Sequence, residues 1–86
     1  MEIDKLEQLK YDLDRNMYDI TYIKDGHDRI ARATTNPEYL ANMSSAYKER
    51  PQDAEEYAVF FDYNSYEWVC VHIGDIREIK LINSFA

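Results

Sequence analysis

Apolar residues recur at spacings of three and four over residues 2–17. This spacing places them on one side of a helix, as is typical of an amphipathic helix packed on a core. Glu2 and Asp4 lie in the first turn, where the helix dipole favours negative charge. We therefore predict a helix over residues 2–17. Its apolar side would be formed by Ile3, Leu6, Leu9, Leu13 and Met17.

Residues 18–34 fit two structures. Apolar and polar residues alternate from Tyr18 to Ile23, as in a half-buried strand. Lys24-Asp25-Gly26 is a turn signal, because glycine adopts positive φ without strain. A return strand would follow over residues 29–34. In the alternative, the first helix continues as a heptad seam with Asn16 buried in it. The β-rich sequence and Gly26 favour the hairpin, which we predict.

A second helix is predicted to begin at Asn36-Pro37-Glu38. Asn is a favoured N-cap, Pro is favoured at the first helical position, and Glu suits the first turn. Pro51 would end the helix just after Arg50. Its apolar side would be formed by Leu40, Met43 and Tyr47.

The strongest hairpin pattern covers residues 56–73. Two runs rich in aromatic and β-branched residues flank Asn64-Ser65, and Asn tolerates the left-handed backbone that a two-residue turn needs. Such a turn fixes the register of the two strands. It would place Tyr63 opposite Tyr66, Phe61 opposite Trp68, Val59 opposite Cys70 and Asp62 opposite Glu67.

Residues 75–83 again fit two structures. Asp75 and Glu78 have the spacing of a capping box, which would begin a short helix. Alternation from Arg77 to Leu81 fits a strand instead. We predict the strand, because a two-stranded hairpin is marginally stable on its own.

These elements predict one α+β domain over residues 1–86. It would consist of a helix, a hairpin, a second helix, and a C-terminal antiparallel hairpin with a third strand. A chain of 86 residues with 45% apolar residues is long enough for one core and too short for two. It contains no run of about 18 apolar residues, so we expect no membrane span.

The predicted C-terminal hairpin is apolar on both sides, whereas a half-exposed hairpin alternates apolar with polar residues. Either the helices cover both sides or one side meets a partner, and we favour burial within the domain. Asp62 and Glu67 would face each other at an exposed tip. Like charges at paired positions are destabilising, so water must screen them or an external cation must complete them.

Charge is spread unevenly along the chain. The formal net charge is −7. Residues 1–50 carry ten acidic and eight basic side chains, whereas residues 51–86 carry seven acidic and two basic ones. No Lys or Arg lies between Arg50 and Arg77. This balance disfavours direct binding of nucleic acid or of an anionic membrane, and it favours a basic protein partner.

Catalytic and metal-binding patterns are weak in this sequence. Cys70 and His72 lie two residues apart on one strand face, but aromatic neighbours suggest a buried, structural Cys70. A single cysteine excludes an internal disulfide and fits a reducing compartment. The acidic, amphipathic start is unlike a signal peptide. We therefore expect a cytoplasmic protein that is not an enzyme and uses no cofactor or metal.

The preferred hypothesis is a small acidic inhibitor that docks on the basic surface of another protein. If that surface normally binds nucleic acid, the carboxylates would mimic phosphates. In size and charge, although in no motif, the chain is similar to small acidic viral inhibitors and to bacteriocin immunity proteins. The alternative is a structural or homo-oligomeric subunit that uses the aromatic hairpin face, and an enzyme is the third hypothesis. The candidate partner-binding residues are Asp53, Glu55, Glu56, Asp62, Tyr63, Tyr66, Glu67 and Asp75.

Overall fold

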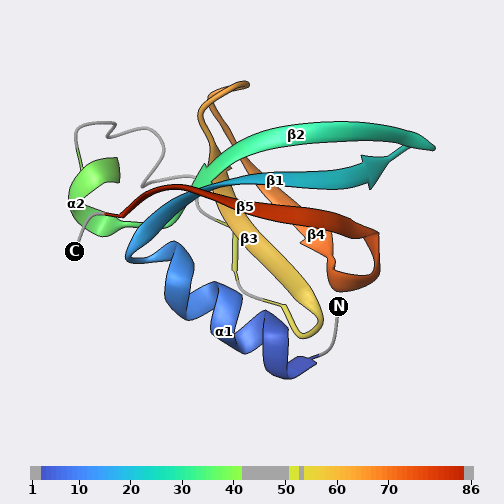
Figure 1. Ribbon diagram of the computed structural model, residues 1–86, viewed down its shortest axis with the longest axis horizontal. Coiled ribbons are helices and arrows are strands. Elements are labelled where there is room, and N and C mark those ends of the chain that lie inside the picture. The colour runs from blue at the N-terminus through green and yellow to red at the C-terminus, as the bar shows by residue number, and fades with distance from the viewer. Residues whose placement is uncertain (1–2, 42–50, 53, 85–86) are drawn as a thin grey trace.

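The fold is a small α+β domain built from an N-terminal helix and a five-stranded antiparallel sheet (Figure 1). The computed structural model describes residues 3–41, 51–52 and 54–84. The helix and the antiparallel sheet confirm the predicted α+β fold class. In chain order the elements are α1 (Ile3–Leu13), β1 (Asn16–Lys24), β2 (His27–Thr34), α2 (Pro37–Leu40), β3 (Tyr57–Asp62), β4 (Glu67–His72), the 3-10 helix η1 (Ile73–Asp75) and β5 (Ile76–Ser84).

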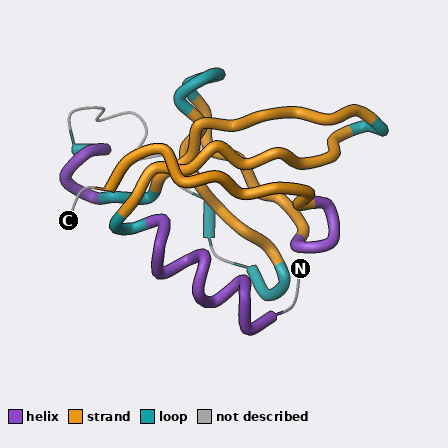
Figure 2. The backbone as a smooth tube through the Cα atoms, in the orientation of Figure 1, coloured by secondary structure: helices purple, strands orange, loops and turns teal. Residues whose placement is uncertain are grey.

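The sheet has the strand order β4-β3-β2-β1-β5, so β4 and β5 form its two edges. These edge strands are consecutive in the chain and are joined by the short helical turn η1, visible in Figure 2. The β1–β2 and β3–β4 hairpins cross at an open angle, and they pair only at Ala33 with Asp62 and Thr34 with Phe61. The sheet therefore curls, and its interior faces α1.

The first helix ends earlier than predicted, at Leu13 rather than at residue 17. Two threonines at the end of β2 account for this end: the Thr35 N–H and the Thr34 hydroxyl both donate to the Leu13 carbonyl, at 3.0 and 2.9 Å. The terminal carbonyl of a helix has no partner within the helix, so these contacts satisfy it. Met17 is buried as predicted, but it lies in β1.

The hairpin predicted within residues 18–34 is confirmed, and the continued helix is excluded. β1 and β2 are antiparallel, with Lys24 paired to His27 across a two-residue turn. The turn residues Asp25 and Gly26 have φ of 54° and 78°. Positive φ at both positions matches the right-handed twist of the strands, which is why such turns favour Asp-Gly.

The predicted start of the second helix is also confirmed. The Tyr39 N–H donates to Asn36 Oδ1 at 2.9 Å, and Pro37 occupies the first helical position. Leu40 is buried. The predicted continuation through Met43 and Tyr47 to Arg50 lies outside the described residues.

Residues 76–84 form the predicted strand, but its neighbour differs from the one expected. β5 pairs with β1 rather than with the β3–β4 hairpin, with Ile79 opposite Ile20 and Leu81 opposite Tyr18. No helix in the described part of the chain is long and apolar enough to cross a membrane.

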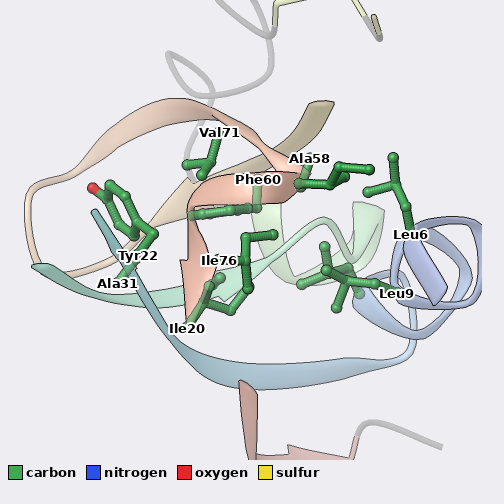
Figure 3. Close-up of a cluster of buried hydrophobic side chains, with 12 residues drawn as sticks. Leu6, Leu9, Ile20, Tyr22, Ala31, Ala58, Phe60, Val71 and Ile76 are labelled. Carbon is green, nitrogen blue, oxygen red and sulfur yellow. The ribbon is translucent and has the colours of Figure 1, made fainter. Parts of the chain in front are cut away.

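The main core lies between α1 and the inner side of the curled sheet. In Figure 3, Phe60 lies at its centre, with Leu6 and Leu9 of α1 at one end and Tyr22 at the other. Tyr22 meets the Phe60 ring edge-on, at 6.4 Å between ring centroids. A helix stripe and the alternate residues of the strands thus bury one continuous set of side chains.

A second, smaller core lies on the outer side of the β3–β4 hairpin. Phe61 packs there with Leu40 of α2, and Tyr63 and Trp68 lie partly buried against them. Apolar residues on both sides of this hairpin are therefore largely explained by burial within the domain, as predicted. Tyr57, Tyr66 and Cys70 are exceptions, because each leaves more than a third of its surface exposed.

Candidate protein-binding surface

The β3–β4 hairpin has the predicted register. Phe61 pairs with Trp68, Val59 with Cys70, and Asp62 with Glu67. Its turn is longer than the predicted two residues, because the strands end at Asp62 and Glu67 and residues 63–66 form the loop. Tyr66 has φ of 55° there, a left-handed conformation that is uncommon for a large side chain.

Asp62 accounts for this wider turn. Its Oδ1 accepts the N–H groups of Asn64, at 2.8 Å, and of Arg32, at 3.1 Å. Its Oδ2 accepts the Ser65 hydroxyl at 2.9 Å. One carboxylate thus holds the loop and joins β2 to β3. The Asn64 side chain adds a donor to the Ile30 carbonyl at 3.1 Å.

The prediction that Asp62 and Glu67 form an exposed pair is therefore wrong in one respect. The two residues are opposite each other, but Asp62 is only 5% exposed and is fully engaged by internal donors. Hydrogen bonds from Arg32, Asn64 and Ser65 therefore satisfy this carboxylate within the chain. Asp62 has no need of an external cation, and Glu67 alone presents a carboxylate to solvent.

Aromatic rings line the outer side of the hairpin tip. Phe61 contacts Tyr63 at 5.0 Å, Trp68 at 5.7 Å and Tyr66 at 6.5 Å between ring centroids. Tyr39 of α2 meets Tyr63 at 5.2 Å. All these pairs are edge-to-face, a preferred geometry for aromatic side chains. The rings therefore form a rigid platform on which Tyr66, 68% exposed, is the outermost member.

Tyr63 is the buried member of this platform. Burial, followed by the neighbouring phenols of Tyr39 and Tyr66, raises the pKa of Tyr63 to about 12. Its hydroxyl is buried and has no hydrogen-bond partner among the described residues. Tyr63 therefore contributes packing to the tip, and Tyr66 is the tyrosine available to a partner.

A second group of predicted site residues lies at the other end of the hairpin. Glu56 has φ of 66°, and its carbonyl accepts the Ile73 N–H at 2.9 Å. Its carboxylate lies 3.7 Å from His72 Nε2. His72 Nδ1 accepts the Gly74 N–H at 3.0 Å, which orients the ring. Glu55 and Asp75 are both exposed at this end.

A groove of about 410 Å³ connects the two ends of the hairpin. One wall follows β4, from Glu67 to His72, and continues to Asp75. The other wall is the end of β1, residues 22–25. Three carboxylates, those of Asp25, Glu67 and Asp75, are exposed along it, against one lysine, Lys24.

Tyr22 lies where this groove meets the main core. It is 6% exposed, and burial followed by the charge of Asp62 raises its pKa, with a smaller contribution from Glu67. Arg29 acts in the opposite direction. The groove thus has an apolar floor of Tyr22, Val69 and Val71 and a negative rim.

The structure brings only some of the predicted site residues together. Glu67 and Asp75 share the groove, Tyr63 and Tyr66 share the aromatic platform, and Glu55 and Glu56 lie near the base of the hairpin. Asp62 is internal, and Asp53 lies outside the described residues. Two residues that line the groove, Lys24 at the end of β1 and Asp25 in the following turn, were missed. The turn signal around Gly26 predicted their hairpin but carried no information on its position beside β4.

Cys70 does not have the predicted environment. It is exposed on β4, whereas its pairing partner Val59 is buried. The assignment of Cys70 to the core was therefore wrong. Among the described residues, no three His, Cys, Asp or Glu side chains are grouped closely enough to hold a metal ion.

Comparison of the chain with protein-family models, with curated proteins and with solved structures found no match.

Proposed function

We propose that this chain is a small acidic protein that binds a basic surface of another protein through the β3–β4 hairpin. The observation that carries the proposal is the groove along β4. Asp25, Glu67 and Asp75 surround it, and among the described residues Lys24 is the one lysine or arginine that lines it. Like charges held around a concave surface create a potential that attracts the opposite charge.

Besides charge, such an interface needs apolar anchors, and the aromatic platform provides them. Charges steer association and select the partner, whereas buried aromatic anchors provide much of the binding energy. Tyr66 is held at the hairpin tip by its contacts with Phe61 and Tyr63, so it loses little conformational freedom on binding. Arg or Lys side chains of a partner would pair with the groove carboxylates and stack on the exposed Tyr66 ring.

Inhibition follows if the basic surface of the partner normally binds nucleic acid. The groove and the hairpin base carry carboxylates at Glu55, Glu56, Glu67 and Asp75, where they can occupy positions that phosphates would take. A protein with net charge −7 competes with nucleic acid for such a surface without binding nucleic acid itself.

The test is affinity capture from the native host with two variants. In E67K/D75K, both substitutions reverse exposed groove carboxylates. In D4K/E7K, the same number of charges is reversed on the exposed side of α1. The proposal predicts that the wild type and D4K/E7K capture the same basic protein and that E67K/D75K loses it.

Asp14 is unsuitable as a control, because its carboxylate accepts the Thr35 hydroxyl and helps to hold α1 against β2. Circular dichroism and the urea midpoint establish that each variant is folded. Capture of a protein that is not basic, or equal loss of binding in D4K/E7K, would contradict the proposal.

A further inference from the structure

The outer edge of β5 is an interaction surface separate from the hairpin and its groove. β5 is the edge strand beyond β1, and no described strand pairs with its other side. It is nine residues long and pairs regularly with β1 from Glu78 to Leu81, between two register shifts. Leu81 and Ile82 on it are 55% and 39% exposed. A long edge strand with exposed apolar side chains is a template for pairing with another chain.

The charges on this edge are self-complementary. If two copies of β5 pair antiparallel with Ile79 opposite Ile79, then Glu78 of each copy lies opposite Lys80 of the other. Both side chains are exposed and form no ion pair with another described residue. Opposite charges at directly paired positions stabilise a sheet. Shifting the centre by one residue would instead place Lys80 opposite Lys80.

An apolar hollow lies beside the same edge. It has a volume of about 200 Å³ and is lined by Leu9 and Asp12 of α1, Tyr18 of β1 and Ile79 of β5, among others. Ile79 and Leu81 pair with Ile20 and Tyr18 and share their side of the sheet. In the register centred on Ile79, the two Ile79 side chains therefore meet on the side where the hollow opens, and Leu81 of each copy lies opposite Arg77 of the other.

We propose that the occupant of this edge is a second copy of the same chain, forming a twofold dimer with β5 paired antiparallel to its equivalent. A twofold axis requires a surface that is complementary to itself. Two equivalent Glu78–Lys80 pairs across the axis meet this condition. The dimer would join two five-stranded sheets into one of ten strands. The groove along β4, at the opposite edge, stays accessible in both copies.

The test uses sedimentation equilibrium of wild type, E78K, K80E and E78K/K80E over a range of concentrations. Each single reversal replaces two attractive pairs by two repulsive ones and should weaken the dimer roughly tenfold or more. The double variant restores opposite charges in the same register and should dimerise like the wild type. A mixture of E78K with K80E should form a heterodimer, because one strand then carries two lysines and the other two glutamates.

Two exposed substitutions away from β5, R29E and E38K, provide matched charge reversals and should leave the dimer constant unchanged. Lys80 also lies opposite Asp19 within the chain, so the urea midpoint of K80E is measured first. The proposal is overturned if the wild type is monomeric at millimolar concentration. It is also overturned if E78K dimerises as strongly as the wild type, or if the mixture of single variants does not associate.

Discussion

Asp62 was predicted from its charge to bind a partner, but its role is structural. It lies in an acidic, aromatic segment, and its position opposite Glu67 suggested two carboxylates at an exposed tip. Instead it accepts hydrogen bonds from Arg32, Asn64 and Ser65 and is buried. The pairing could be predicted from the turn. The burial could not, because it depends on β2, which lies thirty residues away in the sequence.

Removal of the Asp62 carboxylate should therefore destabilise the fold. In D62A three donors lose their acceptor, and we expect a loss of about 2–4 kcal/mol in the free energy of unfolding. E67A, which changes the exposed partner across the hairpin, should change it by less than about 0.5 kcal/mol. Urea denaturation measures both variants. A D62A variant as stable as E67A would show that the hydrogen-bond network contributes little.

Tyr63 should make stability fall at high pH. Its pKa is about 12 in the folded protein and about 10 in an unfolded chain. Above pH 10 the unfolded state loses this proton while the folded state retains it. Below pH 10 Tyr63 therefore makes its full contribution to the free energy of unfolding. This contribution is lost as the pH rises from 10 to 12.

The Y63F variant tests this assignment. It should weaken the fall in urea midpoint between pH 10 and pH 12 and remove one late-titrating phenol from the ultraviolet titration. Tyr18 and Tyr22, whose pKa values are also raised, should still contribute to the loss of stability at high pH. Because the Tyr63 hydroxyl has no described partner, Y63F should be as stable as the wild type at pH 7. A marked loss of stability at pH 7, or an unchanged alkaline profile, would contradict the account.

At the scale of elements, local signals predicted both hairpins, the cap of α2 and the register of β3 with β4. Asn36, Pro37 and Gly26 act through their own backbone neighbours, so sequence alone identifies them. The end of α1 depends on Thr34 and Thr35, more than twenty residues later. The pairing of β5 with β1 likewise depends on the curl of the sheet. Contacts of this kind leave no local pattern.

The β1–β2 turn offers a direct test of such a local signal. Gly26 has φ of 78°, and a Cβ placed there would have no atom within 4 Å. Any cost of G26A therefore comes from the backbone and not from a clash. We expect a loss of about 1 kcal/mol, whereas D25N should be nearly neutral because Asn also tolerates positive φ. Equal stability of G26A and the wild type would show that the turn relaxes to another conformation.

At the scale of the molecule, the curl of the sheet creates the candidate surface. The β1–β2 and β3–β4 hairpins pair over only two residue pairs and then separate, which leaves the groove between β4 and the end of β1. The sequence indicated an acidic segment from Asp53 to Asp75, but one wall of the groove comes from residues 22–25. Charge and aromatic content could thus be predicted, whereas their arrangement around a groove required the fold.

The two proposed interfaces use opposite edges of this sheet. β5 would join two copies, while each β4 and its groove would face a partner. A dimer would then present two negative grooves, and binding to a partner that is itself multivalent would gain from effective concentration. Each interface can be tested separately, because the groove reversals fall on β4 and η1 whereas the dimer reversals fall on β5.

The most direct test of the central claim is the association rate of the captured partner as a function of ionic strength. Exposed charges are screened over about 10 Å at 0.1 M salt, so a steered encounter slows as salt is added. The account predicts fast, salt-sensitive association for the wild type and for D4K/E7K. E67K/D75K should associate slowly at low salt and differ little at high salt. If D4K/E7K slows as much as E67K/D75K, or the wild-type rate does not respond to salt, the groove along β4 is not the partner-binding surface.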